Sequence, residues 1–128
     1  MITADERSAY AVVEDDPLMA NLVSNMLASS DVDIEMFMLI ADFLKCENLQ
    51  KFKAILLDLS LPDIDGLKVL ERLEALSVCA PVVLMSAHES HVLAAAKIVG
   101  NGYGLNVTTV LRKPYARQEL LSALEISV

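Results

Sequence analysis

The sequence predicts an α/β fold in which one doubly wound, five-stranded parallel sheet is covered by helices on both faces. Short apolar runs alternate along the chain with longer stretches in which apolar residues recur at helical spacing. The length of 128 residues suits one domain, and 55% of the residues are hydrophobic, which is enough for a core. We therefore predict five strand–helix units with right-handed crossovers, forming a single domain over residues 1–128.

The first unit begins with the apolar run Ala9–Val13, which has the length and composition of a buried strand. Asp16 and Pro17 come shortly after it and are typical of a helix N-cap and a first helical turn. Between positions 18 and 27 apolar residues recur at helical spacing. The unit therefore leads from a buried strand into an amphipathic helix with a defined start.

The second unit is predicted from a short strand at Ile34–Phe37 and a helix over residues 39–49. The third unit has the clearest strand, because Ala54–Asp58 consists of four apolar residues and a terminal acid, and proline and glycine breakers follow. Its helix is predicted to begin after Gly66, where apolar residues again recur on one face.

The last two units complete the sheet. Pro81–Met85 predicts the fourth strand, and a helix follows from near residue 89 to about residue 99. Thr109–Arg112 and Arg117–Leu124 predict the fifth strand and the fifth helix. Three of the four glycines lie between these two units and predict a helix C-cap followed by a flexible connector; they are Gly100, Gly102 and Gly104.

Composition narrows the classes of function. A net charge of -8 at pH 7 argues against direct binding of nucleic acid and suits a domain that binds a cation and other proteins. Cys46 and Cys79 lack metal-binding or redox spacing, so we expect reduced thiols and a cytoplasmic location. The polar N-terminus does not resemble a signal peptide, and no apolar run approaches the ~20 residues that cross a bilayer, so we expect no membrane insertion.

Polar or charged side chains that could take part in a reaction or bind a ligand lie at four of the predicted strand ends. Glu14 and Asp15 follow the first strand, Asp58 ends the third, Ser86 follows the fourth and Lys113 follows the fifth. The carboxyl ends of parallel strands meet at one edge of the sheet, which is where open α/β sheets bind ligands. Carboxylates gathered there repel one another unless a cation or a proton lies between them.

In chain order these motifs are an acid pair, an Asp before a Pro-Asp-x-Asp-Gly turn, Ser-Ala and Lys-Pro. In this combination the chain resembles, over nearly its whole length, the response regulator receiver domains of two-component signalling. The resemblance implies a flavodoxin-like fold with strand order 2-1-3-4-5. It also implies a signalling module that catalyses only its own phosphorylation and dephosphorylation, not an enzyme with a separate substrate.

The resemblance further implies a metal site for Mg²⁺ or Mn²⁺. Its ligands would be the carboxylates of Glu14, Asp15 and Asp58 together with the backbone carbonyl of Ser60. Oxygen ligands of this kind are those that a hard divalent cation prefers. In this interpretation Glu14 acts mainly through water molecules on the metal.

Asp58 would be the phosphoacceptor, since phosphoryl transfer depends above all on charge neutralisation and positioning. Ser86 would donate its hydroxyl to a phosphoryl oxygen, and the compact charge of Lys113 would pair with another oxygen, or with Asp58 before modification. Pro114 matches the cis-proline position of the family and would help to aim Lys113.

The resemblance also implies which classes of protein this chain would bind. A sensor histidine kinase or a histidine phosphotransfer protein would supply the phosphoryl group. The fourth helix, fifth strand and fifth helix would form the face that signals to an output domain or protein, or that forms a homodimer. The Gly-Leu-Asn-Val stretch at residues 104–107 resembles receivers joined to cyclic-di-GMP phosphodiesterase domains. We expect either a stand-alone receiver or a piece of a longer regulator, because the sequence stops at Val128.

One departure from the family pattern keeps alternatives open. Many receivers carry an aromatic switch residue where this chain has Val110, and a valine side chain has no comparable inward and outward swing. A pseudo-receiver that binds proteins without being phosphorylated is therefore an alternative. A phosphatase of the haloacid-dehalogenase type is less favoured, because that family needs an acid at the position of Ser60. A flavodoxin-type flavin site is also less favoured, because the chain lacks the phosphate-binding loop that such a site has after the first strand.

Overall fold

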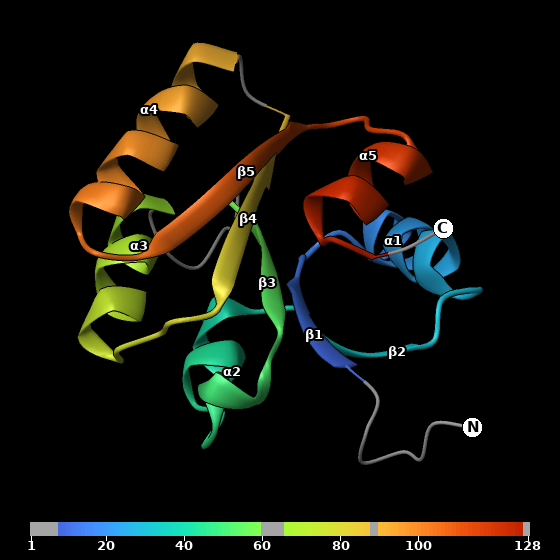
Figure 1. Ribbon diagram of the computed structural model, residues 1–128, viewed down its shortest axis with the longest axis horizontal. Helices are drawn as coiled ribbons and strands as arrows, with labels where there is room; N and C mark the ends of the chain where they lie inside the picture. Colours follow the sequence, from blue (N-terminus) through green and yellow to red (C-terminus); the bar gives the residue numbers. More distant parts are fainter. Residues whose placement is uncertain (1–7, 60–65, 88–89, 127–128) are drawn as a thin grey trace.

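The computed structural model describes residues 8–59, 66–87 and 90–126, and its centre is a five-stranded sheet of parallel strands in the order β2-β1-β3-β4-β5 (Figure 1). The predicted fold class and strand order are thereby confirmed. The strands are β1 (Ser8–Val13), β2 (Val32–Phe37), β3 (Ala54–Asp58), β4 (Pro81–Ser86) and β5 (Asn106–Arg112).

Helices cover both faces of the sheet, as right-handed crossovers between parallel strands require. Helices α1 and α5 lie on one face, and α2, α3 and α4 lie on the other (Figure 1). The helices are α1 (Pro17–Leu27), α2 (Ile40–Leu44), α3 (Gly66–Ala75), α4 (Ser90–Gly102) and α5 (Arg117–Ala123), with a 3-10 turn, η2, at Leu49–Lys51. None of the helices in the described part of the chain has the length and hydropathy that a membrane span requires.

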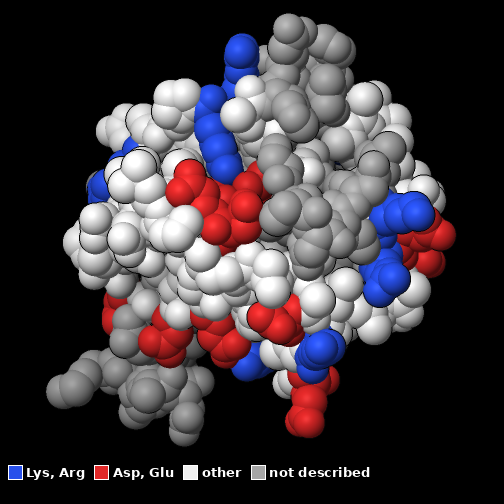
Figure 2. Space-filling model, turned by 180° about the vertical axis from the view of Figure 1, so that it is seen from behind, with Lys and Arg blue, Asp and Glu red and all other residues white. Residues whose placement is uncertain are grey.

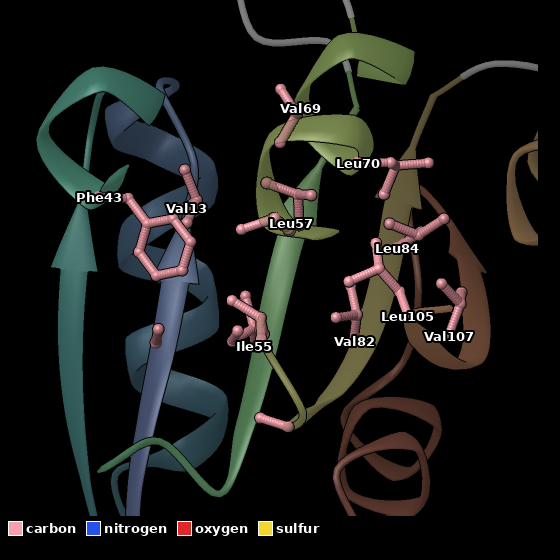
Figure 3. Packing of buried hydrophobic residues seen from close by; sticks show 14 of the residues in the cluster. Val13, Phe43, Ile55, Leu57, Val69, Leu70, Val82, Leu84, Leu105 and Val107 are labelled. Carbon is pink, nitrogen blue, oxygen red and sulfur yellow. The ribbon is translucent and has the colours of Figure 1, made fainter. Parts of the chain in front are cut away.

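The core consists of two apolar clusters, one on each side of the sheet. Successive residues of a strand point to opposite faces, so Ile55 and Leu57 of β3 join one cluster while Ala54 and Leu56 join the other. All five residues of β3 are buried, which fits its central place in the sheet. Figure 3 shows the first cluster, in which Ile55 and Leu57 lie among side chains of the neighbouring strands and of α2 and α3.

Two of the predicted helices differ from the structure by more than one residue at an end. The second helix was predicted over residues 39–49, but α2 ends at Leu44 and is followed by the separate turn η2. The fourth was predicted to end near residue 99, but α4 continues through Gly100 and ends at Gly102. Of the three glycines in this stretch, only Gly104, with a φ of 93°, adopts the left-handed conformation expected just beyond a helix end. The predicted flexible connector at residues 100–102 is therefore wrong.

Contacts between α4 and β5 explain why the helix continues. A Cβ atom on Gly100 would lie 2.6 Å from Cγ2 of Val107, so only glycine allows the helix to approach the strand this closely. The side-chain amide of Asn101 donates to the carbonyl of Val107 at 3.2 Å, and its oxygen accepts from the N–H of the same residue at 2.8 Å. The strand also begins at Asn106, three residues earlier than predicted.

Candidate functional site

The strand order places the predicted site residues at one edge of the sheet. Glu14 directly follows β1, Asp58 is the last residue of β3, Ser86 is the last residue of β4, and Lys113 directly follows β5. These four strands are consecutive neighbours in the sheet, so their carboxyl ends meet. This is the edge at which parallel α/β sheets bind ligands.

The Lys113 ammonium contacts two buried carboxylates. Its Nζ atom donates to Oε1 of Glu14 at 2.6 Å and to Oδ2 of Asp58 at 3.0 Å. The Glu14 and Asp58 side chains are 0% and 2% exposed, whereas that of Lys113 is 16% exposed. Burial alone would lower the pKa of Lys113, but the hydrogen bonds and negative charges of Glu14 and Asp58 outweigh burial and raise it. The lysine is therefore held in its charged form between the two acids.

A backbone hydrogen bond to β4 fixes the position of the Lys113 main chain. Its N–H donates to the carbonyl of Ser86 at 2.8 Å, which extends the pairing of β4 and β5 by one residue beyond Arg112. The peptide bond between Lys113 and Pro114 is cis, as the family resemblance implied. Ser86 itself is fully buried at the end of β4. Ser60, the predicted backbone ligand, lies outside the described residues.

Three carboxylates converge beside this lysine. Oxygen atoms of Glu14, Asp15 and Asp58 all lie within 4.8 Å of one another. The pKa of Glu14 is raised to about 7: burial has the largest effect, the hydrogen bond and negative charge of Asp58 raise it further, and Lys113 and the N–H of Asp16 lower it. When ionised, the three acids and Lys113 together carry two excess negative charges. A divalent cation with oxygen ligands fits both the charge and the donor set.

Acidic side chains also gather near the centre of the face shown in Figure 2, with basic side chains beside them. Acidic groups that lie close together favour the approach of cations over that of anions.

Sequence reasoning missed one residue of this region. Tyr115, two residues after Lys113, is 5% exposed, and its hydroxyl donates to the sulfur of Met85 at 3.1 Å. Burial raises the pKa of Tyr115, and the charges of Glu14 and Asp58 raise it further. The signal in the sequence was an aromatic residue directly after Lys-Pro. Val110, where an aromatic was missing, is partly buried against the cluster on the side of α2, α3 and α4.

Comparison with known proteins adds independent support. The family profile of the response regulator receiver domain matches residues 11–125. The response regulator protein TodT of Pseudomonas putida is 25% identical over 125 residues, 98% of this chain and 53% of TodT. The cell cycle response regulator CtrA of Brucella ovis is 27% identical over 117 residues, 91% of this chain and 48% of CtrA. This chain thus spans about half the length of these curated relatives.

Solved structures give the same result. The crystal structure of a response regulator from Colwellia psychrerythraea is 30% identical, with a TM-score of 0.80 over 92% of this chain and 94% of the other. The profile match covers all five strand–helix units apart from the first residues of β1. The chain therefore belongs to the response regulator receiver domain family, the signalling modules of two-component systems.

Proposed function

We propose that this chain receives a phosphoryl group on Asp58 and passes the resulting signal to a partner. The observation that carries the proposal is the position of the Asp58 carboxylate, 3.0 Å from the Lys113 ammonium and within the acid cluster of Glu14 and Asp15. A lysine ammonium and a group of carboxylates able to hold a metal ion suit an oxygen that must approach an anionic phosphoryl group.

In the proposed reaction a carboxylate oxygen of Asp58 forms a bond to phosphorus. The bond from phosphorus to the donor breaks, and its electron pair stays on the leaving group, an imidazole nitrogen for phosphohistidine or a carboxylate oxygen for acetyl phosphate. Lys113 neutralises charge on the transferred group, and Ser86 donates a hydrogen bond to one of its oxygens. Later attack by water on phosphorus would break the bond to the Asp58 oxygen, release inorganic phosphate and restore the Asp58 carboxylate.

Glu14, Asp15 and Asp58 would hold Mg²⁺ or Mn²⁺, and the backbone carbonyl of Ser60 would be a further ligand. When bound, the metal supplies positive charge that offsets the negative charge of the phosphoryl oxygens. The cluster fits this ion because two of its acids are buried, and burial together with the neighbouring Asp58 raises the pKa of Glu14 in the absence of a cation. This chain's own contribution is to hold the acids in place beside a lysine.

The proposed phosphodonor is a sensor histidine kinase or a histidine phosphotransfer protein. The proposed signalling face consists of α4, β5 and α5, for an output domain, a separate protein or a second copy of this chain. The residue stretch 104–107 favours a cyclic-di-GMP phosphodiesterase domain as the output. Phosphorylation would shift a conformational equilibrium at this face, because the transferred group adds negative charge beside β4 and β5.

The test is incubation of the chain with Mg²⁺ and acetyl phosphate, followed by intact mass measurement. We expect a mass gain of one phosphoryl group that disappears in Asp58→Asn and on chelation of the metal. Asp42→Asn, which changes an exposed acid on α2, is the matched control and should be phosphorylated normally. The absence of any mass gain in the unaltered chain would instead favour the pseudo-receiver alternative, and turnover of a free phosphomonoester would favour a phosphatase.

A further inference from the structure

Tyr115 links the segment after β5 to the strand beside the proposed phosphoacceptor. Its ring belongs to the buried cluster on the side of α1 and α5, together with Met85, Leu120 and Leu121. Pro114 is the only residue between Tyr115 and Lys113. A fixed position for the Tyr115 ring therefore restricts where the Lys113 backbone can lie.

The hydroxyl of Tyr115 is fixed at a defined point of β4. It donates to Sδ of Met85 at 3.1 Å within the buried cluster. Met85 is the register partner of Asp58 across the β3–β4 pairing, and its carbonyl accepts from the N–H of Leu59 at 3.0 Å. The tyrosine thus connects the lysine-bearing segment to the residue that lies directly beside Asp58.

We infer that Tyr115 is a positioning residue that holds Lys113 against Glu14 and Asp58 through its contact with Met85. By holding Lys113 in place, Tyr115 speeds phosphoryl transfer to Asp58; this consequence rests on the proposed function. Val110, at the position of the usual aromatic switch, packs on the other face of the sheet from Tyr115. The aromatic side chain at the site end of β5 is thus supplied from the loop before α5.

The closeness of Tyr115 to the acids supports this role. Burial raises the pKa of the Tyr115 phenol, and the charges of Glu14 and Asp58 raise it further, so the hydroxyl keeps its proton and remains a donor. A buried hydroxyl whose acceptor is lost carries a desolvation cost, so the contact with Met85 favours a single arrangement of this loop. Removal of the hydroxyl or of the sulfur should loosen the same contact.

The first experiment measures the position of Lys113 without any phosphorylation. The chain is labelled with a small amount of acetic anhydride, and acetylation of Lys113 is compared by peptide mass mapping with that of Lys68, an exposed lysine on α3. In Tyr115→Phe and Met85→Leu we expect the reactivity of Lys113 relative to Lys68 to rise about twofold to tenfold, the range that one net hydrogen bond allows. Unchanged relative reactivity in both variants would overturn the inference.

The matched control is Tyr10→Phe. Tyr10 is 2% exposed and belongs to the same cluster as Tyr115, but it pairs with Ala54 at the start of β3, at the opposite edge of the sheet from the site. The control removes the same atom from the same apolar cluster. It should change thermal stability without changing the relative reactivity of Lys113, and an equal rise in this variant would show a merely structural effect.

The second experiment measures the rate of phosphorylation by acetyl phosphate with Mg²⁺ in a double-mutant cycle. Tyr115→Phe and Met85→Leu should each slow the reaction about twofold to tenfold, and the double variant should be no slower than the slower single variant, because both changes break one contact. The inference that Tyr115 speeds phosphoryl transfer would be overturned if the rate reductions of the two single variants multiplied in the double variant, or if the variants reacted as fast as the unaltered chain. If the unaltered chain is not phosphorylated, the proposed function fails, and the acetylation result alone decides whether Tyr115 positions Lys113.

Discussion

At the scale of single residues, Glu14 has the most unusual environment in the site. Its side chain is fully buried, it receives a hydrogen bond from Lys113 at 2.6 Å, and it still has a pKa raised to about 7. Burial and the neighbouring Asp58 oppose its charge more strongly than the lysine supports it. The metal-free site therefore holds a proton on its carboxylates at pH values where an exposed glutamate is ionised.

This environment predicts a specific dependence of stability on pH. The pKa of Glu14 is about 7 in the folded chain and 4.5 for an ordinary glutamate, so between these values the folded state binds more protons than the unfolded state. The free energy of unfolding should therefore fall as pH rises from 4.5 to 7, by at most about 3 kcal/mol, and then level off. Glu14→Gln should remove this part of the slope.

The measurement is denaturant unfolding of the metal-free chain at several pH values. The quantity of interest is the difference in free energy between the variant and the unaltered chain, because other titrating groups are common to both. Glu71→Gln, an exposed change on α3, is the control and should give a constant difference. A constant difference for Glu14→Gln as well would show that Glu14 titrates normally.

At the scale of secondary structure, α4 and β5 form the most closely fitted pair outside the sheet. Gly100 lets the helix approach Val107, Asn101 makes two hydrogen bonds to the backbone of the same valine, and Lys97 donates to the carbonyl of Thr108 at 3.3 Å. These contacts act on the start of β5, whose other end leads to Lys113. The helix and strand of the proposed signalling face are thus fixed to each other at the end remote from the site.

Two glycines of α4 allow a matched test of this fit. Gly100→Ala would place a Cβ atom 2.6 Å from the stiff Val107 side chain, so we expect a loss of about 1–3 kcal/mol in the free energy of unfolding. Gly102→Ala meets nothing within 4 Å and should be neutral or stabilising by up to about 1 kcal/mol, because alanine favours the helix. Chemical denaturation of both variants checks this, and equal effects would contradict the close approach.

The same region shows where sequence reasoning succeeded and where it failed. Ala54–Asp58 was predicted with its correct bounds, because four apolar residues that end on an acid before a turn are typical of a buried central strand. The end of α4 was misplaced, because glycine usually ends a helix and its role here depends on Val107, a contact that local sequence does not contain. The strand ends alone predicted that Glu14, Asp58 and Lys113 would lie together, and the structure brings them into contact. The role of Tyr115 was not predicted, because it depends on which side chain its hydroxyl reaches.

At the scale of the whole molecule, the chain is an acidic domain in which three of the 18 acidic residues converge at one site. Cation binding there should stabilise the entire fold, since an ion that binds the folded state alone shifts the unfolding equilibrium. At a Mg²⁺ concentration 100 times the dissociation constant the gain is about 2.7 kcal/mol. The raised pKa of Glu14 adds a pH effect, because protons compete with the metal at low pH.

We therefore expect Mg²⁺ to raise the melting temperature of the unaltered chain more at pH 8 than at pH 6. Asp15→Asn removes a carboxylate of the cluster and should reduce the shift at both pH values. Asp42→Asn lowers the negative charge equally, but at an exposed position on α2 that is not part of the cluster, and should leave the shift unchanged. Equal shifts for both variants would mean that Mg²⁺ acts by general screening rather than at a site.

The single ammonium of Lys113 serves as counter-ion for two buried acids. If Asp58 is phosphorylated as proposed, the added negative charge draws the ammonium toward the modified side chain and leaves Glu14 less well compensated. Glu14 must then take up a proton or share a metal ion, because it remains shielded from water. Phosphate, proton and metal occupancy are thereby thermodynamically linked, and each changes the binding of another by the same factor in both directions.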